Sequence, residues 1–147
     1  MDPLITVSQA HSRIYEMLNV HQKLLLDVNH FDVFGYVKAL NKLFTDLVVP
    51  HFEFEESEIF PVVFVRKDLG LGEIISELLQ EHKDILKRLS GLSDKNAGLI
   101  NTSNSSQEEK DSLLASCNIL RRELLAHAQK EDAQFYPKIK DIMFKMR

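Results

Sequence analysis

The sequence predicts an all-α protein, an up-down-up-down four-helix bundle, and three observations support this prediction. Apolar residues recur at spacings of three and four along four long segments. Only 5 Gly and 4 Pro occur among 147 residues, so little punctuation interrupts those segments. Short or polar stretches separate the segments, as expected for antiparallel helices. The length favours one domain over residues 1–147.

The first helix is predicted over residues 4–28, and its inward stripe contains two histidines. The stripe consists of Leu4, Val7, His11, Ile14, Leu18, His21, Leu25 and Val28. A turn is expected near residues 30–35, where His30 would be exposed to solvent.

The second helix continues the same rhythm and carries a histidine and a carboxylate four residues apart. Its stripe consists of Val37, Leu40, Phe44, Leu47, His51, Glu55, Glu58 and Val62. His51 and Glu55 should share one helix face. Pro50 removes a backbone donor, so we expect the helix to be interrupted just before His51. A loop is predicted at residues 67–72.

The third and fourth helices repeat this arrangement. The third runs over residues 71–92 with His82 on its stripe, and a flexible polar loop is predicted at about residues 93–107. The fourth begins near Glu108 and carries His127 and Glu131, again four residues apart. Cys117 lies on the same stripe and is expected to pack in the core.

The four helices bring one histidine each to a common depth. Residues at equal distance from a turn lie at equal depth in antiparallel helices. The midpoints of His11 and His51, of His51 and His82, and of His82 and His127 all fall in or beside predicted connections. His21 is an alternative to His11; if it is not a ligand, it is expected to be a core histidine hydrogen-bonded near Asn41. Glu58 and Asp132 are alternative carboxylates, Glu53 and Glu56 are expected to be solvated, and Tyr15 is expected to be a packing aromatic beside the pocket.

These side chains predict a metal site formed by His11, His51, Glu55, His82, His127 and Glu131. Burying so many polar groups without a compensating cation would cost several kcal/mol or more. Imidazole and carboxylate ligands suit iron, with manganese or zinc as substitutes. If each glutamate bridges, two metals each receive two histidines and two carboxylate oxygens, and a shared oxo or hydroxo group completes five ligands.

The pattern His11, His51-x-x-x-Glu55, His82, His127-x-x-x-Glu131 resembles a hemerythrin-like domain of the HHE cation-binding family. The resemblance covers nearly the whole chain and implies a non-haem di-iron centre with those six ligands. Ferritin-like proteins match less well, because they use Glu-x-x-His.

One position departs from the oxygen-carrying members of that family, which have a second histidine four residues after the third-helix ligand. Leu86 occupies that position. The departure argues against reversible oxygen transport. We therefore expect a protein that binds a small diatomic or oxidant (O2, NO or peroxide) as sensor, scavenger or reservoir. The alternatives are a di-iron enzyme that turns over peroxide or NO, an iron-centre repair protein, and a helical interaction module with a structural metal.

Composition excludes several other classes. The net charge of −4 argues against a nucleic-acid partner. The single cysteine excludes an internal disulfide and a cysteine metal cage. No signal peptide or membrane-spanning run is evident, so a cytoplasmic location without membrane contact is expected. The partner is expected to be a small diatomic or anionic ligand.

Overall fold

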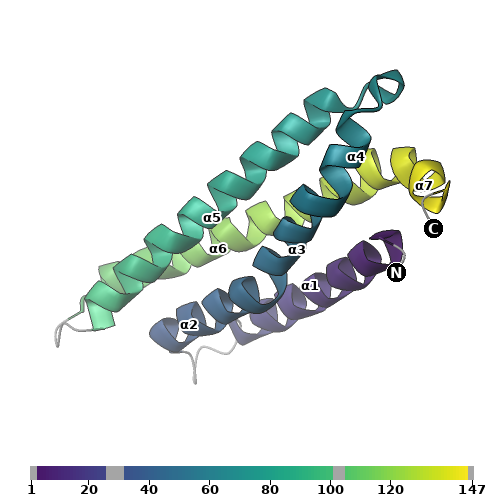
Figure 1. The fold of residues 1–147 in the computed structure, drawn as a ribbon. Helices are drawn as coiled ribbons and strands as arrows, with labels where there is room; N and C mark the ends of the chain where they lie inside the picture. The colour runs from purple at the N-terminus through teal and green to yellow at the C-terminus, as the bar shows by residue number, and fades with distance from the viewer. Residues whose placement is uncertain (1–2, 26–31, 101–104, 146–147) are drawn as a thin grey trace.

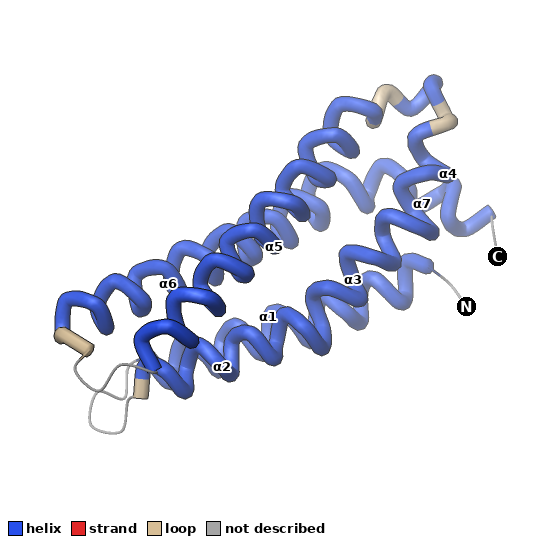
Figure 2. The backbone as a smooth tube through the Cα atoms, turned by 60° about the vertical axis from the view of Figure 1, so that its left-hand side comes forward, coloured by secondary structure: helices blue, strands red, loops and turns tan. Residues whose placement is uncertain are grey.

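The structure, a computed structural model, describes residues 3–25, 32–100 and 105–145. The side chains of residues 24–25 and 141–145 are not described, so the predicted stripe positions Leu25 and Val28, and the predicted exposure of His30, lie outside the described part. The described residues form helices without a strand (Figure 2). None of these helices combines the length and apolar composition needed to cross a membrane.

Four helical rods make up the bundle. The first rod is α1 (Pro3–Leu25), and the third is α5 (Gly72–Ile100). The second rod consists of α2 (Val33–Leu43), η1 (Phe44–Val48), α3 (Val49–Phe54), η2 (Glu55–Ile59) and α4 (Phe60–Phe64). The fourth rod consists of α6 (Gln107–Lys130), η4 (Glu131–Phe135) and α7 (Tyr136–Lys145). Successive rods run in opposite directions, so the up-down-up-down bundle is confirmed (Figure 1). The start of α1 and the end of α7 lie at the same end of the bundle.

Local sequence signals fix the ends of the rods. Asp32 caps α2 by accepting a hydrogen bond from the Phe34 N–H. A short 3₁₀ turn, η3 (Lys67–Leu69), ends at Gly70, whose φ of 64° is left-handed and favours glycine. Ser106 and Glu109 form a reciprocal capping box at the start of α6.

In the described part of the chain, three π turns interrupt the rods, and each ends two residues before a proline. The turns η1, η2 and η4 precede Pro50, Pro61 and Pro137. In each turn an N–H reaches back five residues instead of four, for example from Phe60 to the Glu55 carbonyl. The interruption expected before His51 therefore takes the form of a π turn, a feature that is frequent at functional sites.

The π turns also correct the predicted stripe of the second rod. Each extra residue rotates the following side chains, so Val48 and Ile59 are buried in place of the predicted Leu47 and Glu58. Glu58 is exposed and is excluded from the buried centre on this ground.

The prediction of a flexible loop at about residues 93–107 is wrong over the first half of that range. Helix α5 continues to Ile100. Leu92 and Asn96 are buried, and Leu99 packs against the core, so the inward face persists although the neighbouring residues are small and polar. Residues 101–104 lie outside the described part.

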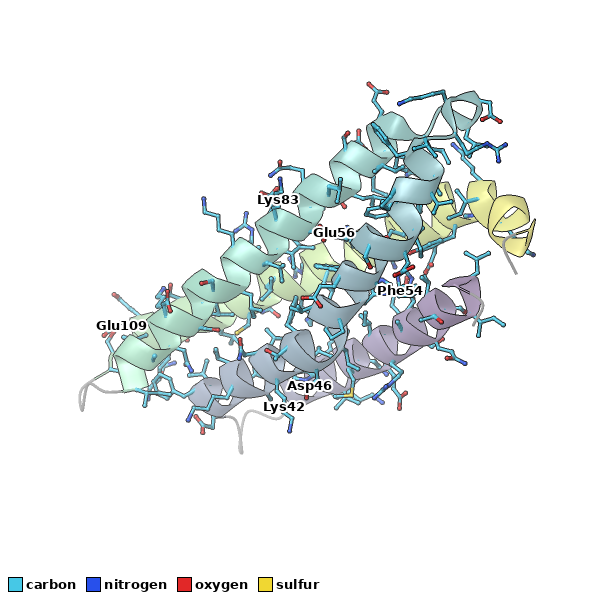
Figure 3. The ribbon with its side chains drawn as sticks, viewed as in Figure 1. Lys42, Asp46, Phe54, Glu56, Lys83 and Glu109 are labelled. Carbon is cyan, nitrogen blue, oxygen red and sulfur yellow. The ribbon has the colours of Figure 1, made fainter. Side chains whose placement is uncertain are left out.

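The core consists of two apolar clusters with a polar layer between them. One cluster, around Phe44 and Leu120, lies towards the end of the bundle where α5 connects to α6. The other, around Phe60 and Phe135, lies towards the opposite end, where α4 connects to α5. Charged side chains such as Lys42, Asp46 and Lys83 point outward (Figure 3). The polar layer is made of His11, His51, Glu55, His82, His127 and Glu131.

Candidate metal centre

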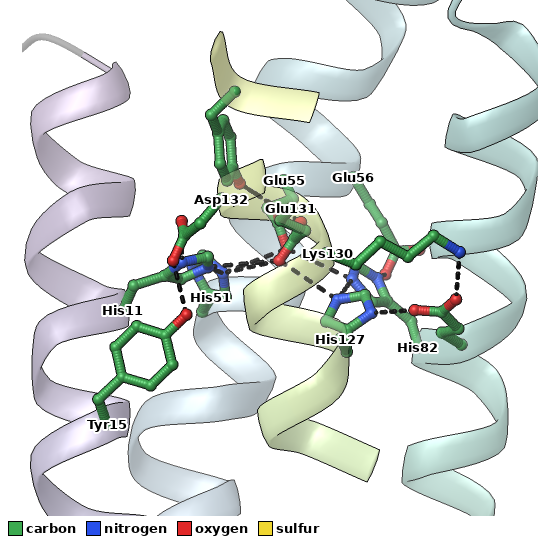
Figure 4. Close-up of polar contacts among 12 residues, drawn as sticks. His11, Tyr15, His51, Glu55, Glu56, His82, His127, Lys130, Glu131 and Asp132 are labelled. Carbon is green, nitrogen blue, oxygen red and sulfur yellow. Dashed lines mark hydrogen bonds and ion pairs between the residues drawn. The ribbon is translucent and has the colours of Figure 1, made fainter. Parts of the chain in front are cut away.

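All six residues of the polar layer converge inside the bundle (Figure 4). Their exposed fractions are 3% for His11, 5% for His51, 0% for Glu55, 1% for His82, 2% for His127 and 0% for Glu131. At such burial, water cannot solvate the imidazoles and carboxylates, so they must satisfy one another or a bound ion.

The histidines form two pairs that face each other through their Nε2 atoms. His11 Nε2 lies 3.0 Å from His51 Nε2, and His82 Nε2 lies 3.1 Å from His127 Nε2. The first pair joins α1 to α3, and the second joins α5 to α6. The predicted common depth of the four histidines is therefore observed.

The two glutamates link one histidine pair to the other. Glu55 Oε1 lies 3.2 Å from His51 Nε2 and 3.3 Å from His82 Nε2. Glu131 Oε1 lies 3.3 Å from both His11 Nε2 and His127 Nε2. Each carboxylate oxygen thus stands between an imidazole of one pair and an imidazole of the other.

The outer nitrogens of three histidines are held by carboxylates. The Nδ1 atoms of His11, His82 and His127 lie 2.8, 3.0 and 2.7 Å from Asp132, Glu56 and Glu81, respectively. An ionised carboxylate only accepts hydrogen bonds, so Nδ1 carries the proton and donates. That tautomer leaves the Nε2 lone pair directed into the polar layer.

Further side chains support these outer carboxylates. The Tyr15 hydroxyl donates to Asp132 at 2.6 Å. Lys130 donates to Glu81 at 2.7 Å and also pairs with Glu77 at 2.9 Å. The outer partners therefore differ: a neutral hydroxyl supports the carboxylate of His11, whereas an ammonium group supports that of His127.

Tyr136, the first residue of α7, reaches the polar layer from the apolar cluster around Phe60 and Phe135. Its hydroxyl donates to Glu55 Oε2 in a short hydrogen bond and lies 3.4 Å from Glu131 Oε2. The phenol therefore binds the outward oxygen of Glu55 and lies beside that of Glu131, while both Oε1 atoms face the histidines.

Electrostatics separate the two glutamates. Burial and the charge of Glu131 raise the pKa of Glu55 well above its usual range. Burial also favours the neutral form of Glu131, but its close polar contacts with Glu55, His11 and its other neighbours outweigh burial and lower the pKa of Glu131 well below its usual range. Burial and the neighbouring His127 lower the pKa of His82 to about 4. The polar layer thus disfavours the ionised form of both glutamates at once. It also favours the neutral imidazole of His82, which is the form that binds metals.

Two observations test whether this layer fits cations. Glu55 Oε1 and Glu131 Oε1 are buried without a hydrogen-bond partner, and a buried polar atom left so costs about 1–3 kcal/mol, more when charged. When His82 and His127 are neutral and both carry their proton on Nδ1, beside Glu56 and Glu81, two Nε2 lone pairs face each other at 3.1 Å. A cation among these atoms would remove both problems at once. The donor set of imidazoles and carboxylates fits iron, manganese or zinc.

The remaining candidates from the sequence lie elsewhere. His21 is buried in the neighbouring apolar cluster, where its ring contacts Tyr36, and its expected hydrogen bond near Asn41 is not seen among the described residues. Asp132 does not replace Glu131; it holds His11 from outside. Leu86, one turn after His82, is half-buried against the apolar core.

Sequence reasoning missed the outer carboxylates and Tyr136. Glu56 was expected to be solvated, and its side chain is 44% exposed, yet it holds His82. The available signal was adjacency, because Glu56 and Asp132 directly follow Glu55 and Glu131, and Glu81 directly precedes His82. Tyr136 precedes the proline that ends the second repeat. Tyr15, expected to be a packing aromatic, also donates a hydrogen bond that supports the centre.

The chain matches the model of a known protein family. The family described as hemerythrin HHE cation binding domain matches residues 2–139, nearly the whole chain. Comparisons with curated proteins and with solved structures gave no match. The match covers every residue of the polar layer and its outer carboxylates, and the chain belongs to the hemerythrin HHE cation-binding domain family.

Proposed function

We propose that this chain is a non-haem di-iron protein that binds a small diatomic or oxidant, namely O2, NO or peroxide. Its role would be that of a sensor, scavenger or reservoir. The proposed ligands are the six residues of the polar layer, two histidines for each iron with both glutamates shared.

The observation that carries this proposal is the position of the two glutamate Oε1 atoms between the histidine pairs. Glu55 Oε1 is within 3.3 Å of an Nε2 atom from each pair, and so is Glu131 Oε1. A site for a single metal ion would not need two histidine pairs and two shared glutamates. Two imidazole pairs with two shared carboxylates provide two cation positions.

Bound ferrous ions would supply open coordination positions and electrons for a small oxidant. The chain itself supplies orientation and exclusion of water. Asp132 and Glu81 fix the rings of His11 and His127 through their Nδ1–H groups, which also raises the basicity of the inward nitrogens. Phe52 stacks on His82 at a centroid distance of 3.8 Å and covers that ring with apolar surface.

The test is binding of NO to iron-loaded protein. Protein loaded anaerobically with ferrous ion and titrated with NO should give a saturable change in absorbance. The change should be absent after chelation. Iron-loaded protein whose absorbance does not respond to NO would contradict ligand binding at the centre.

Leu86 favours consumption of an oxidant over its reversible carriage. A leucine side chain cannot ligate, and here it packs against the apolar core. When reduced protein is mixed with O2 and the O2 is then removed, the spectrum of the reduced state should not return. Recovery of that spectrum would make reversible oxygen carriage the better account. Leu86→His should shift the protein towards such recovery.

A further inference from the structure

A hollow on the protein surface leads to the polar layer between α1 and α7. Its volume is about 520 Å³. Its walls combine the apolar or aromatic side chains of Leu4, Tyr15 and Pro137 with polar ones that include Asp132 and Lys140. The buried lining residues Val7, His11 and Tyr136 form its floor.

The floor of the hollow is one side chain thick. Tyr136 lines the hollow, and its hydroxyl is hydrogen-bonded to the carboxylate of Glu55. His11 also lines the hollow, and its Nε2 atom is 3.3 Å from Glu131 Oε1. A molecule in the hollow is therefore separated from the centre only by the rings of His11 and Tyr136.

Closely packed side chains close the floor of the hollow. Val7, His11 and Tyr136 have exposed fractions of 2%, 3% and 9%, so no open channel passes between them. Small rotations of closely packed rings can pass a diatomic molecule, but a bulky anion would need larger rearrangement. The charge of Asp132 is already bound by Tyr15 at 2.6 Å and by His11 at 2.8 Å.

Among the described residues, two other hollows touch the polar layer, and the one beside His127 is lined by six charged side chains against two in the hollow beside His11. The hollow of about 780 Å³ beside His127 contains the ion pairs Glu81–Lys130 and Arg88–Glu123, at 2.7 and 2.9 Å. Glu81 covers His127 Nδ1 there, just as Asp132 covers His11 Nδ1 in the hollow between α1 and α7. The hollow of about 270 Å³ beside His51 is bordered by charged and amide side chains of Gln9, Arg13 and Asp46. A neutral molecule meets fewer charged side chains in the hollow beside His11 than in the hollow beside His127, so it disturbs the hydration of fewer charges there.

We propose that the hollow between α1 and α7 is the access route by which a small neutral molecule, of the size of O2 or NO, reaches the centre. This inference rests on the proposed function for its iron-dependent test. Passage occurs past Val7 and between the rings of His11 and Tyr136. Ser8 and Ser12 form part of the rim and are exposed.

The first test blocks the rim and leaves the polar layer unchanged. Ser8→Trp/Ser12→Trp should slow the association of NO with reduced, iron-loaded protein several-fold in stopped-flow measurements, with the iron content unchanged. Ala126→Trp is the matched control, because Ala126 is an exposed residue of the hollow beside His127. Wild-type association rates in the double variant, or slowing by Ala126→Trp alone, would overturn the proposal.

The second test needs no iron and separates this inference from the proposed function. Xenon occupies apolar cavities, so metal-free crystals under xenon pressure should show a xenon atom beside Val7 and Tyr136. The atom should be lost in Ser8→Trp/Ser12→Trp. Xenon bound only beside His127 or His51, or in none of these hollows, would contradict the route. A chain that binds no iron but does bind xenon beside Val7 would refute the proposed function while supporting the hollow as a binding place for small apolar molecules.

Discussion

His11 and His21 occupy the same face of α1 and are equally buried, each with 3% of its surface exposed, yet their surroundings differ completely. His11 Nδ1 is 2.8 Å from Asp132, and its Nε2 is 3.0 Å from His51 Nε2. His21 Nδ1 has no hydrogen-bond partner among the described residues, and the ring packs edge-on against Tyr36 at 5.4 Å.

The difference shows that burial alone does not identify a ligand. What distinguishes His11 is an outer carboxylate on one ring nitrogen and a second imidazole facing the other. Burial lowers the pKa of His21 and leaves it neutral within an apolar cluster. At His11 burial also disfavours the charged form, but Glu131 and Asp132 outweigh it and raise the pKa.

The largest expected effect follows from removing the two buried glutamates beside His11 and the other histidines of the polar layer, since no such carboxylates surround His21 within the described ranges. Glu55→Ala/Glu131→Ala should abolish metal binding and the response of the melting temperature to chelators. A metal at 100 times its Kd adds about 2.7 kcal/mol, so chelation should lower the wild-type Tm by ~5–10 °C in a chain of this size. Thermal melts with and without a chelator measure this.

The matched control for that experiment is Glu53→Ala/Glu58→Ala, which removes two exposed glutamates from the rod that carries Glu55. It should keep the chelator response. An unchanged Tm in wild-type protein after complete metal removal would mean that no cation stabilises the polar layer.

The next effect compares the two histidines directly. His11→Ala should lower the metal content per chain or shift the metal spectrum, because it removes one proposed ligand. His21→Ala should destabilise the chain through a lost side chain in the core but leave metal content unchanged. Elemental analysis of both purified variants decides, and a loss of metal confined to His21→Ala would reverse the assignment.

A smaller effect is expected from the outer carboxylate of His11. Asp132→Asn keeps an acceptor for the Nδ1–H group but removes its charge, so metal affinity should fall by about 10–100-fold. Competition with a chromogenic chelator measures the affinity. Glu53→Gln removes the charge of an exposed side chain of the second rod and should retain wild-type affinity.

The smallest effect concerns the pH dependence at His21. The folded-state pKa of His21 lies below the ordinary value of 6.5 because of burial. The unfolded chain therefore binds a proton that the folded chain does not, and stability should fall as pH drops below that value. Between pH 7 and 5.5, His21→Leu should lose less stability than wild type, by up to about 1 kcal/mol. Chemical denaturation of both proteins at the two pH values measures the difference, and equal losses would mean that His21 is solvated.

The sequence predicts the four rods and the depth of the four histidines because both follow from helical periodicity and turn position. It does not predict that Ile59 is buried in place of Glu58, because a π turn adds a residue without altering the apolar pattern that precedes it. The end of α5 at Ile100 was also missed, since small polar residues around Asn96 concealed a continuing inward face.

The outer partners are the least predictable part of the centre. Glu56 and Asp132 lie off the inward stripe of their own rods and reach the histidines of neighbouring rods. Such contacts depend on the spacing and rotation of packed helices, which a single sequence does not specify. The Tyr136 hydroxyl bond to Glu55 arises in the same way, from residues that are far apart in the chain.

The measurement that tests the central claim most directly is an anaerobic titration of metal-free protein with ferrous ion, with bound metal quantified per chain. Two histidine pairs joined by two shared glutamates predict an endpoint at two ions per chain, and Glu55→Ala/Glu131→Ala should bind none. An endpoint at one ion would support a mononuclear site. An endpoint at zero in folded wild-type protein would contradict the metal centre altogether.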